Sequence, residues 1–396
     1  MQNRAVAHLD LDSFFVSVER LLDSRLHHKP VIVGGNSDRG VVAACSYETR
    51  VFGVRSAMPM KMARQLCPDA IVLRGDFEAY SQYSSLVTEI MVNNAPVVEK
   101  ASIDEFYVDM TGMERYFGAW KFVKELRSKV IKETGLSISL GLSGNKTVSK
   151  MATNEAKPAG QLQIFQGEEK AFLAPLCVSK IPLCGKVTTQ TLRNMGITNI
   201  GVLSKMPLRM LEKTFGKLVT TLWERANGID HSPIVPYHDP KSASKEITFE
   251  KDTTDVDFLR RVLIKLVEEL CYDLRKSGFC AGCITVKIRY SNFDTFTKQL
   301  NIQRSASDAV MIKHVLELFE RLYERRILIR LVGVRFNKLV RGTEQLNLFD
   351  GSAKMIPLYY AMDKIRDRYG IHAIGKALNI DLNKRNASLI QNNGTQ

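Results

Sequence analysis

The chain has 396 residues, a length that predicts about two to four domains. Its composition, 45% apolar and 25% charged, is ordinary for a globular protein, and 56 basic against 42 acidic side chains give a net charge of +14. No apolar run approaches the roughly 18 residues of a membrane span, and the N-terminus has no apolar signal region. Seven scattered cysteines favour reduced thiols. We therefore expect a cytoplasmic protein with no membrane partner.

The basic excess lies in the second part of the chain. Residues 1–165 carry 20 basic and 18 acidic side chains, whereas residues 166–396 carry 36 and 24. This asymmetry favours a polyanion held by the C-terminal part, with chemistry in the nearly neutral N-terminal part. A solvated basic surface is the alternative.

The N-terminal part predicts strands and helices in the order β-α-β-β-α-β. A buried strand over 5–11 runs into Asp10 and Asp12, and a helix over 13–22 follows. The order indicates a ferredoxin-like split βαβ sheet, interrupted by an insertion at about 20–75. The further elements expected are a hairpin of 30–33 with 41–44, a helix over 80–92, strands over 97–102 and 106–109, a helix over 119–134 and a strand over 137–142.

The middle of the chain predicts short helices. Glycines break residues 176–230 into segments, with helix–loop–helix-like turns at 181–186 and 196–201. Such turns offer backbone N–H groups to phosphates, or simply pack helices together. Three prolines and little apolar periodicity in residues 231–244 predict a linker.

The C-terminal part predicts a second small α+β domain. An apolar stripe from Phe258 to Leu274 indicates one helix, and another is expected over 308–326. Apolar and polar residues alternate over 284–289 and 332–337. The sheet would therefore have one apolar face and one basic and polar face, suited to a phosphate backbone.

Three carboxylates form the sharpest candidate site. Asp10 ends a predicted strand, and Asp104 and Glu105 lie at a predicted hairpin junction. The first and third strands of a split βαβ sheet are neighbours, so these groups can meet. Clustered carboxylates need a cation, and two Mg²⁺ ions about 4 Å apart would stabilise both oxygens of a phosphoryl transfer. Adjacent strand residues face opposite ways, so Asp104 and Glu105 both reach an ion only where the strand turns. A solvated turn is the alternative.

Four segments carry a family resemblance: DLDSFF (10–15), SYETRVFGV (46–54), SIDE (102–105) and AKPAG (156–160). In this order they resemble the signature of Y-family translesion DNA polymerases of the UmuC/ImpB superfamily, most closely the DinB (DNA polymerase IV) branch. The resemblance extends over about residues 4–340. It implies a DNA-directed DNA polymerase of low fidelity, which extends a primer 3′-hydroxyl past template damage by two-metal-ion nucleotidyl transfer.

The resemblance also implies a multidomain α+β organisation. The expected parts are a ferredoxin-like palm (1–19 and 76–165), a fingers insertion (20–75), a helical thumb (166–235), a linker (236–244), an α/β little finger that binds DNA (245–342) and a tail (343–396).

Roles of the carboxylates follow from the same resemblance. Asp10 and Asp104 match the two metal-bridging aspartates. Glu105 matches the third carboxylate, on the ion that activates the primer hydroxyl, and the Leu11 carbonyl is a further expected ligand. The implied cofactor is Mg²⁺, two ions per site.

Phe15 matches the steric gate, a ring packed against C2′ of the incoming sugar. A bulky apolar side chain there leaves no room and no partner for a 2′-hydroxyl. We expect Phe14 to pack in the core. We expect Asp12 to be structural, as the N-cap of the first helix.

Tyr47, Arg50 and Lys157 match a clamp on the triphosphate of the incoming nucleotide. The sequence departs from the family at Ala44, where a hydroxyl residue is often found. One hydrogen bond to the triphosphate is then missing, or is supplied by Ser46 or by backbone.

Two further features concern partners. Lys146 and Lys150, one turn apart on a short helix, touch phosphates or line an exposed face. The pentapeptide Gln345-Leu346-Asn347-Leu348-Phe349 resembles a bacterial sliding-clamp-binding peptide, in which Gln345, Leu346, Leu348 and Phe349 would bind the β subunit of the clamp. Residues 358–365 beyond it predict an amphipathic helix, similar to the tails of UmuC-like relatives.

The sequence thus predicts a monomeric polymerase whose partners are primer–template DNA, deoxynucleoside triphosphates and the sliding clamp. Two alternatives stay open. One is a palm-domain nucleotidyl cyclase, which would work without DNA. The other is a clamp-tethered DNA-binding factor without catalysis.

Overall fold

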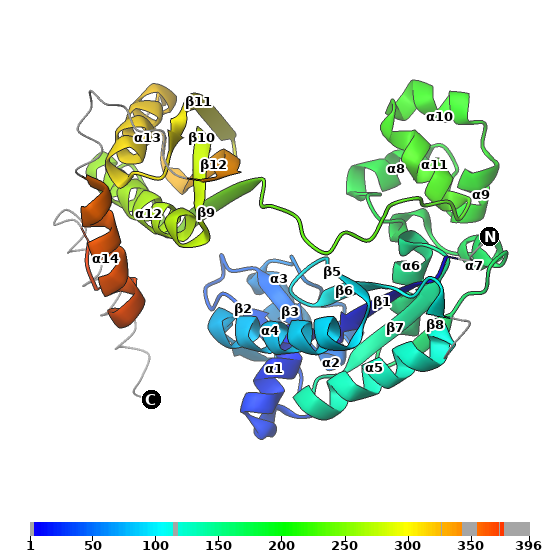
Figure 1. Ribbon diagram of the computed structural model, residues 1–396. Coiled ribbons are helices and arrows are strands. Elements are labelled where there is room, and N and C mark those ends of the chain that lie inside the picture. Colours follow the sequence, from blue (N-terminus) through cyan, green and yellow to red (C-terminus); the bar gives the residue numbers. More distant parts are fainter. Residues whose placement is uncertain (1–3, 114–117, 326, 343–354, 372, 376–396) are drawn as a thin grey trace. The chain divides into compact units, whose positions relative to one another are not determined.

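The computed structural model describes residues 4–113, 118–325, 327–342, 355–371 and 373–375. The chain divides into two compact units, Met1–His238 and Asp239–Gln396 (Figure 1). The division falls inside the expected linker. Within the described ranges, no helix combines the length and apolar character needed to cross a membrane.

A five-stranded sheet organises the first unit, with the strand order β5-β6-β1-β7-β8. The central strand β1 (Val6–Leu11) pairs antiparallel with β6 (Glu105–Asp109) on one side and β7 (Ile138–Ser143) on the other. The other two strands are β5 (Val97–Lys100) and β8 (Gln161–Gln163). The first strand of the βαββαβ unit therefore lies between the third and the fourth, which confirms the ferredoxin-like fold.

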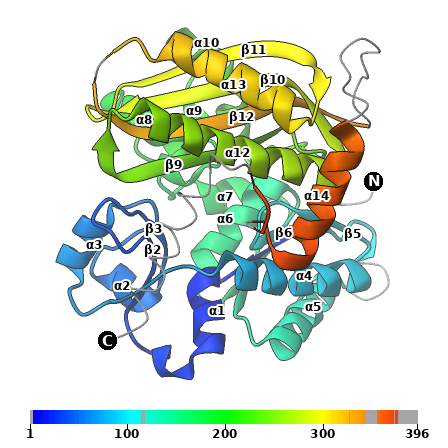
Figure 2. The ribbon, with the colours of Figure 1, turned by 90° about the vertical axis from the view of Figure 1, so that its left-hand side faces the viewer.

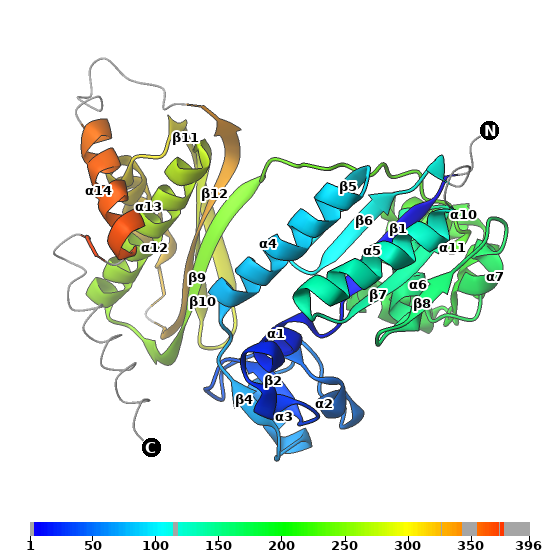
Figure 3. The same ribbon diagram turned by 60° about the horizontal axis from the view of Figure 1, so that its bottom comes forward.

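The two faces of this sheet are covered differently, because side chains alternate along a strand. Ala7 and Leu9 of β1 pack into the apolar core formed with α4 (Phe77–Asn94) and α5 (Ala119–Thr134), which cover one face (Figure 3). The alternate residues His8 and Asp10 are on the opposite face.

Helix α6 (Lys146–Ala156) lies on that opposite face and touches it directly. A Cβ at Gly141 of β7 would come 2.2 Å from the Ser149 carbonyl oxygen, so only glycine permits this approach. The Ser149 hydroxyl donates to the Val6 carbonyl at 2.7 Å. The other side of α6, with Val148 and Met151, belongs to the apolar core of the following helices.

Those following helices form the rest of the first unit after β8. Helix α8 begins after Gly185 and α9 after Asn199, whose side chain caps it by accepting from Val202 N. The elements are α7 (Glu169–Leu173), the 3₁₀ helix η3 (Val178–Lys180), α8 (Lys186–Asn194), α9 (Ile200–Lys205), α10 (Leu208–Phe215) and α11 (Leu218–Ala226).

The insertion after the first helix contains a small three-stranded sheet of order β3-β2-β4. The expected hairpin is present as β2 (Val31–Gly34) and β3 (Val42–Cys45), and β4 (Ile71–Leu73) adds a parallel strand that the sequence did not reveal. Helix α1 (Phe14–Leu22) leads into the insertion. The insertion's own helices are the 3₁₀ helix η1 (Ser24–Leu26), α2 (Tyr47–Val51) and α3 (Met60–Leu66).

The second unit is built on a four-stranded antiparallel sheet of order β11-β10-β12-β9. Helices α12 (Val256–Ser277) and α13 (Asp308–Leu322) lie side by side on one face (Figure 2). The strands are β9 (Ser242–Thr253), β10 (Phe279–Tyr290), β11 (Thr295–Ser305) and β12 (Ile329–Arg341). Because β9 begins at Ser242, residues 242–244 belong to the sheet and not to the expected linker.

The face of this sheet opposite α12 and α13 is polar, as the alternation predicts. It holds an open groove of about 480 Å³, and Lys287 forms an ion pair with Glu246 there at 2.6 Å. The groove is lined by Ser244, Glu246, Cys283, Thr285, Lys287, Thr297, Gln299, Asn301, Gly333, Val334, Arg335, Asn337 and Lys338.

The expected tail helix is present as α14 (Met355–Tyr369), which docks on α12 and α13 on the side away from the sheet (Figure 3). Arg275 of α12 grips Asp363 of α14 through two hydrogen bonds of 2.7 and 2.9 Å. Tyr359 of α14 is buried, and its hydroxyl accepts from Ala309 N at 3.1 Å. The clamp-binding-like peptide 345–349 lies outside the described residues.

Candidate active site

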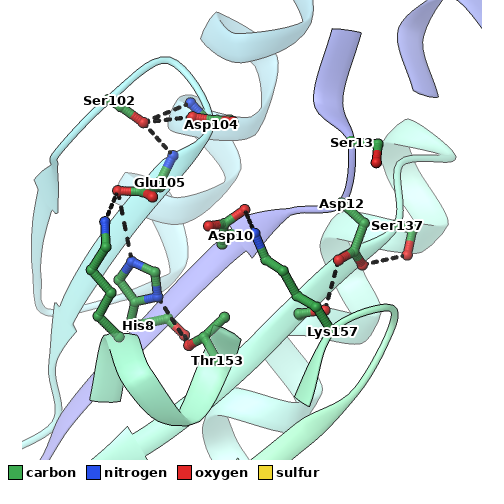
Figure 4. Close-up of polar contacts among 12 residues, drawn as sticks. His8, Asp10, Asp12, Ser13, Ser102, Asp104, Glu105, Ser137, Thr153 and Lys157 are labelled. Carbon is green, nitrogen blue, oxygen red and sulfur yellow. Dashed lines mark hydrogen bonds and ion pairs between the residues drawn. The ribbon is translucent and has the colours of Figure 1, made fainter. Parts of the chain in front are cut away.

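Two carboxylates face each other on the α6 side of the first sheet. Asp10 of β1 is the register partner of Glu105 of β6, so their side chains leave the same face of the sheet (Figure 4). One oxygen of each, together with a ring nitrogen of His8, lie within 4.8 Å of one another. Asp10 and Glu105 therefore meet across neighbouring strands, as the sequence predicts.

Two lysines neutralise this pair. Lys157 Nζ is 2.5 Å from Asp10 Oδ1, and Lys150 Nζ is 2.6 Å from Glu105 Oε2. Burial raises the pKa of Asp10, and the contact with Lys157 opposes that shift. Burial also acts to raise the pKa of Glu105, but the nearby His8 and the hydrogen bond from Lys150 outweigh it and hold this pKa well below its usual range. Each carboxylate of the facing pair is therefore matched by one lysine ammonium group.

Asp104 lies in the bend that precedes β6, where the chain turns as the geometry requires. Its carboxylate accepts a 2.6 Å hydrogen bond from the Ser102 hydroxyl, which in turn accepts from the backbone N–H groups of Asp104 and Glu105. The Asp104 side chain therefore lies beside Ser102 and apart from the facing pair of Asp10 and Glu105 (Figure 4).

The expectation that Asp12 caps the first helix is wrong. Helix α1 begins at Phe14, its N-cap is Ser13 with φ of 45°, and no side chain caps it. The Asp12 carboxylate instead accepts from four donors in distant segments. These are the Tyr47 hydroxyl (3.2 Å), the Ser137 hydroxyl (2.8 Å), the Ser139 hydroxyl (2.8 Å) and Ala159 N (2.9 Å). Asp12 is structural, but as a junction of four segments.

Tyr47 and Arg50 of α2 lie together at this junction. The Arg50 guanidinium is 4.5 Å from the centre of the Tyr47 ring, and it donates to the Ser13 hydroxyl at 3.1 Å. Ser46, one expected substitute for the hydroxyl missing at Ala44, is buried as the N-cap of α2. Its Oγ accepts from Val31 N and Thr49 N, and its full burial keeps the hydroxyl from reaching a nucleotide.

Phe15 and Phe14 differ in exposure. Phe14 is 3% exposed in the core, as expected, whereas Phe15 is half-buried. The Phe15 ring stacks on Tyr80 at 4.3 Å, with 11° between the planes, and meets Phe77 edge-on at 5.5 Å. Aromatic neighbours thus fix its orientation.

His8 is a member of the site that the sequence analysis did not single out. It is fully buried, its Nδ1 lies 2.9 Å from Thr153 Oγ1, and its Nε2 lies 4.0 Å from Glu105 Oε2. Burial lowers the pKa of His8 to about 4, so the ring is neutral at pH 7. The signal was available, because residues two apart on a strand share a face and His8 precedes Asp10 by two.

The chain has counterparts among known proteins. Residues 9–154 match the impB/mucB/samB family, and residues 240–348 match the impB/mucB/samB family C-terminal domain. A DNA polymerase IV of Dehalococcoides mccartyi (strain CBDB1) is 38% identical over 378 residues, which cover 94% of this chain and 97% of that protein. A DNA polymerase IV of Halorhodospira halophila is 34% identical, over 87% of this chain and 98% of the relative.

A solved structure of a Y-family DNA polymerase chimera shares the fold. It is 27% identical, with a TM-score of 0.77, over 85% of this chain and 100% of the chimera. The chain is a Y-family DNA polymerase of the DNA polymerase IV branch. The resemblance drawn from four sequence segments is thereby confirmed, and so is the fold class. In this Y-family polymerase, the Asp10–Glu105 face lies on the sheet within the N-terminal family match.

Proposed function

We propose that the Asp10–Glu105 face is where this translesion DNA polymerase joins a deoxynucleotide to a primer 3′-hydroxyl. The observation that carries the proposal is the register of β1 and β6, which opposes two carboxylates on one face within 4.8 Å. As a DNA polymerase the chain binds DNA and deoxynucleoside triphosphates.

The donor set of this face fits a hard divalent cation. Asp10 and Glu105 offer carboxylate oxygens on one face. Asp104 directly precedes Glu105 and offers a third carboxylate, and Leu11, which follows Asp10, offers its backbone carbonyl. Oxygen donors of this kind suit Mg²⁺ better than a soft thiophilic metal. Two Mg²⁺ ions held by these groups would favour ionisation of the primer hydroxyl and stabilise the leaving pyrophosphate. In this role Asp104 turns away from Ser102.

The groups around Asp12 would hold the nucleotide. Arg50 offers a planar fork and Lys157 a point charge to the triphosphate. The Tyr47 hydroxyl, which donates to Asp12 in the structure, would donate to a phosphate oxygen instead. Phe15, held by Tyr80, would pack against the sugar and exclude a 2′-hydroxyl. With Ser46 engaged as a helix cap, backbone groups are left to replace the hydroxyl missing at Ala44.

The remaining parts would act on DNA. We assign residues 1–19 and 76–165 to the palm, 20–75 to the fingers, 166–235 to the thumb and 245–342 to the little finger. The little finger's polar groove, which includes Lys287 and Arg335, is suited to a phosphate backbone. We further propose a cytoplasmic monomer tethered to the sliding clamp through residues 345–349.

Primer extension tests the site. We would compare wild type with D10N, D104A and E105Q on a primed template with Mg²⁺ and deoxynucleotides. Extension should fall at least about 100-fold in each variant, because each would remove a group that holds the reacting atoms. DNA binding, measured by fluorescence anisotropy, should persist.

A matched control is D109N. Asp109 is on the same strand and the same face as Glu105, at the other end of β6, and it accepts only a local bond from Thr111 N among the contacts described. Loss of extension in D109N as well would mean that the face is merely fragile. Extension that survives in E105Q and D10N would place the chemistry elsewhere. Cyclisation of ATP without DNA would favour the cyclase.

A further inference from the structure

Three lysines of α6 and of its C-terminal end meet three carboxylates of the sheet. They are separated by four and seven positions, a spacing that places them on one side of a helix. Gly141 lets this side of α6 approach the sheet closely enough for contact. The pairs, with their N–O distances, are Lys146–Glu99 (2.6 Å), Lys150–Glu105 (2.6 Å) and Lys157–Asp10 (2.5 Å).

The first pair is tied into the fold on every side. Glu99 also accepts from Val235 N at 2.7 Å, and the Lys146 ammonium lies 4.6 Å from the centre of the Tyr107 ring. Both side chains of this pair are nearly buried, at 16% and 10% exposure. Lys146 is therefore a fixed structural cation.

The second pair, Lys150 and Glu105, is more exposed to solvent, and it includes one of the two facing carboxylates. The Lys150 side chain is 27% exposed, and its acceptor is the Glu105 oxygen that belongs to the cluster with Asp10 and His8. Two carboxylates this close in a buried place do not both stay ionised without positive charge nearby. In the chain alone, Lys150 and Lys157 provide that charge.

A divalent cation bound to the same oxygens would provide it instead. It would also repel an ammonium group 2.6 Å from its ligand, because like charges repel strongly where water is largely excluded. Lysine has a flexible four-carbon stem, so a partly exposed Lys150 has room to turn toward solvent. The contact between Lys150 and Glu105 therefore belongs to the metal-free state.

We propose that Lys150 is a positioning residue that holds Glu105 in the metal-free enzyme and yields its oxygen when a divalent cation binds. This inference rests on the proposed function, which makes the Asp10–Glu105 face the cation site. Lys150 then competes with the cation, so it sets the cation concentration at which the site fills.

Cation binding tests this directly. The full chain would be titrated with Mn²⁺ in the presence of dATP but without primer–template, so that no nucleotide is joined, and unbound Mn²⁺ would be followed by its EPR signal. The Mn²⁺ midpoint should fall about fivefold in K150M, because a competing charge is removed. K150R should stay near wild type. K146M, the matched control on the same helix face, should not shift the midpoint.

Thermal unfolding gives a second readout that does not depend on nucleotide. In EDTA, K150M should melt at a lower temperature than wild type, since it lacks the ammonium group that neutralises Glu105. Saturating Mg²⁺ should remove most of this difference, because a ligand that binds only the folded state replaces the lost stabilisation. K146M should show the same deficit with and without Mg²⁺.

The outcomes separate this inference from the proposed function. An unchanged or higher Mn²⁺ midpoint in K150M overturns the inference; if Lys150 gripped the triphosphate instead, K150M would weaken both dATP and Mn²⁺ binding. A deficit of K150M that Mg²⁺ leaves intact overturns it as well. If D10N leaves Mn²⁺ binding at the wild-type level, the proposed cation site itself fails.

Discussion

The Ser139 hydroxyl donates a 2.8 Å hydrogen bond to Asp12, a residue 127 positions earlier in the chain. With Ser137, Tyr47 and Ala159 N as further donors, the Asp12 carboxylate joins β1, β7, α2 and the loop after α6. The buried carboxylate thus links the segment that carries the candidate nucleotide clamp to the sheet that carries Asp10.

Replacement of Asp12 by serine distinguishes this junction from a helix cap. Serine is a good N-cap, so a capping role would survive D12S almost unchanged. The junction would not, because serine cannot reach four separate donors, and we expect a loss of about 3 kcal/mol in the free energy of unfolding. Urea denaturation measures it. The control is D76S, since Asp76 does cap α4 through Glu78 N and Ala79 N and should lose less than about 1 kcal/mol.

Removal of the Phe15 ring should relax sugar selection. In F15A, discrimination against ribonucleotides should fall by roughly 100-fold, because the space beside C2′ opens. Single-nucleotide incorporation of matched deoxy- and ribonucleotides checks this. F14A should lose about 3–5 kcal/mol of stability, since Phe14 is 3% exposed in the core, and yet keep its sugar selectivity. Equal relaxation in both variants would remove the role given to Phe15.

The docking of α14 should depend on the partly buried ion pair between Arg275 and Asp363. Although burial acts to lower the pKa of Arg275, Asp363 and Asp308 raise it above its usual value. D363N should speed amide hydrogen exchange in α14 by about 100-fold, because it leaves a buried guanidinium short of a partner. D367N weakens an exposed pair with Lys276 at 3.2 Å but keeps a side-chain oxygen that can accept the 2.6 Å hydrogen bond from the Tyr272 hydroxyl, so it should change exchange only a few-fold. Similar rates in the two variants would argue against this assignment.

Cys177 should be the most reactive thiol of the chain. The other six cysteines are buried. Hydrogen bonds from Ser179 and then Arg193 lower the pKa of Cys177 to about 7, so the thiolate predominates above that pH. The rate of iodoacetamide labelling, measured by mass spectrometry, should therefore rise with pH, and the midpoint of this rise should lie near pH 7. In S179A and R193A the midpoint should move upward, toward the ordinary value near 9.

The sequence predicts well the features that follow from the alternation of side chains along a strand and from the order of the strands. The alternation along β1 and the order of a split βαβ unit suffice to bring Asp10 opposite Glu105. The same pattern predicts the apolar and polar faces of β10 and β12. These features rest on repeated local signals, which a single sequence carries in full.

The sequence predicts poorly whatever depends on partners far along the chain. The donors to Asp12 come from residues 47 to 159, and nothing near Asp12 announces them. The hydrogen bond from the Ser102 hydroxyl holds the Asp104 carboxylate away from Asp10 and Glu105. It forms because the chain bends before β6, and the sequence does not reveal the shape of that bend. Short elements such as α2, α3 and β4 offer too few turns or alternations for a periodic signal.

Helix α6 has one further consequence, for anyone who wishes to exchange parts between relatives. Its lysines contact carboxylates of the five-stranded sheet, while Val148 and Met151 on its other side pack in the core of the helices that follow. If those helices were replaced by a relative's, with the junction just after β8, the native α6 would pack against a foreign core. The poor packing would tilt α6 and displace Lys150 and Lys157. The transferable module therefore starts at Asn145, and the β7 strand that receives it must keep Gly141.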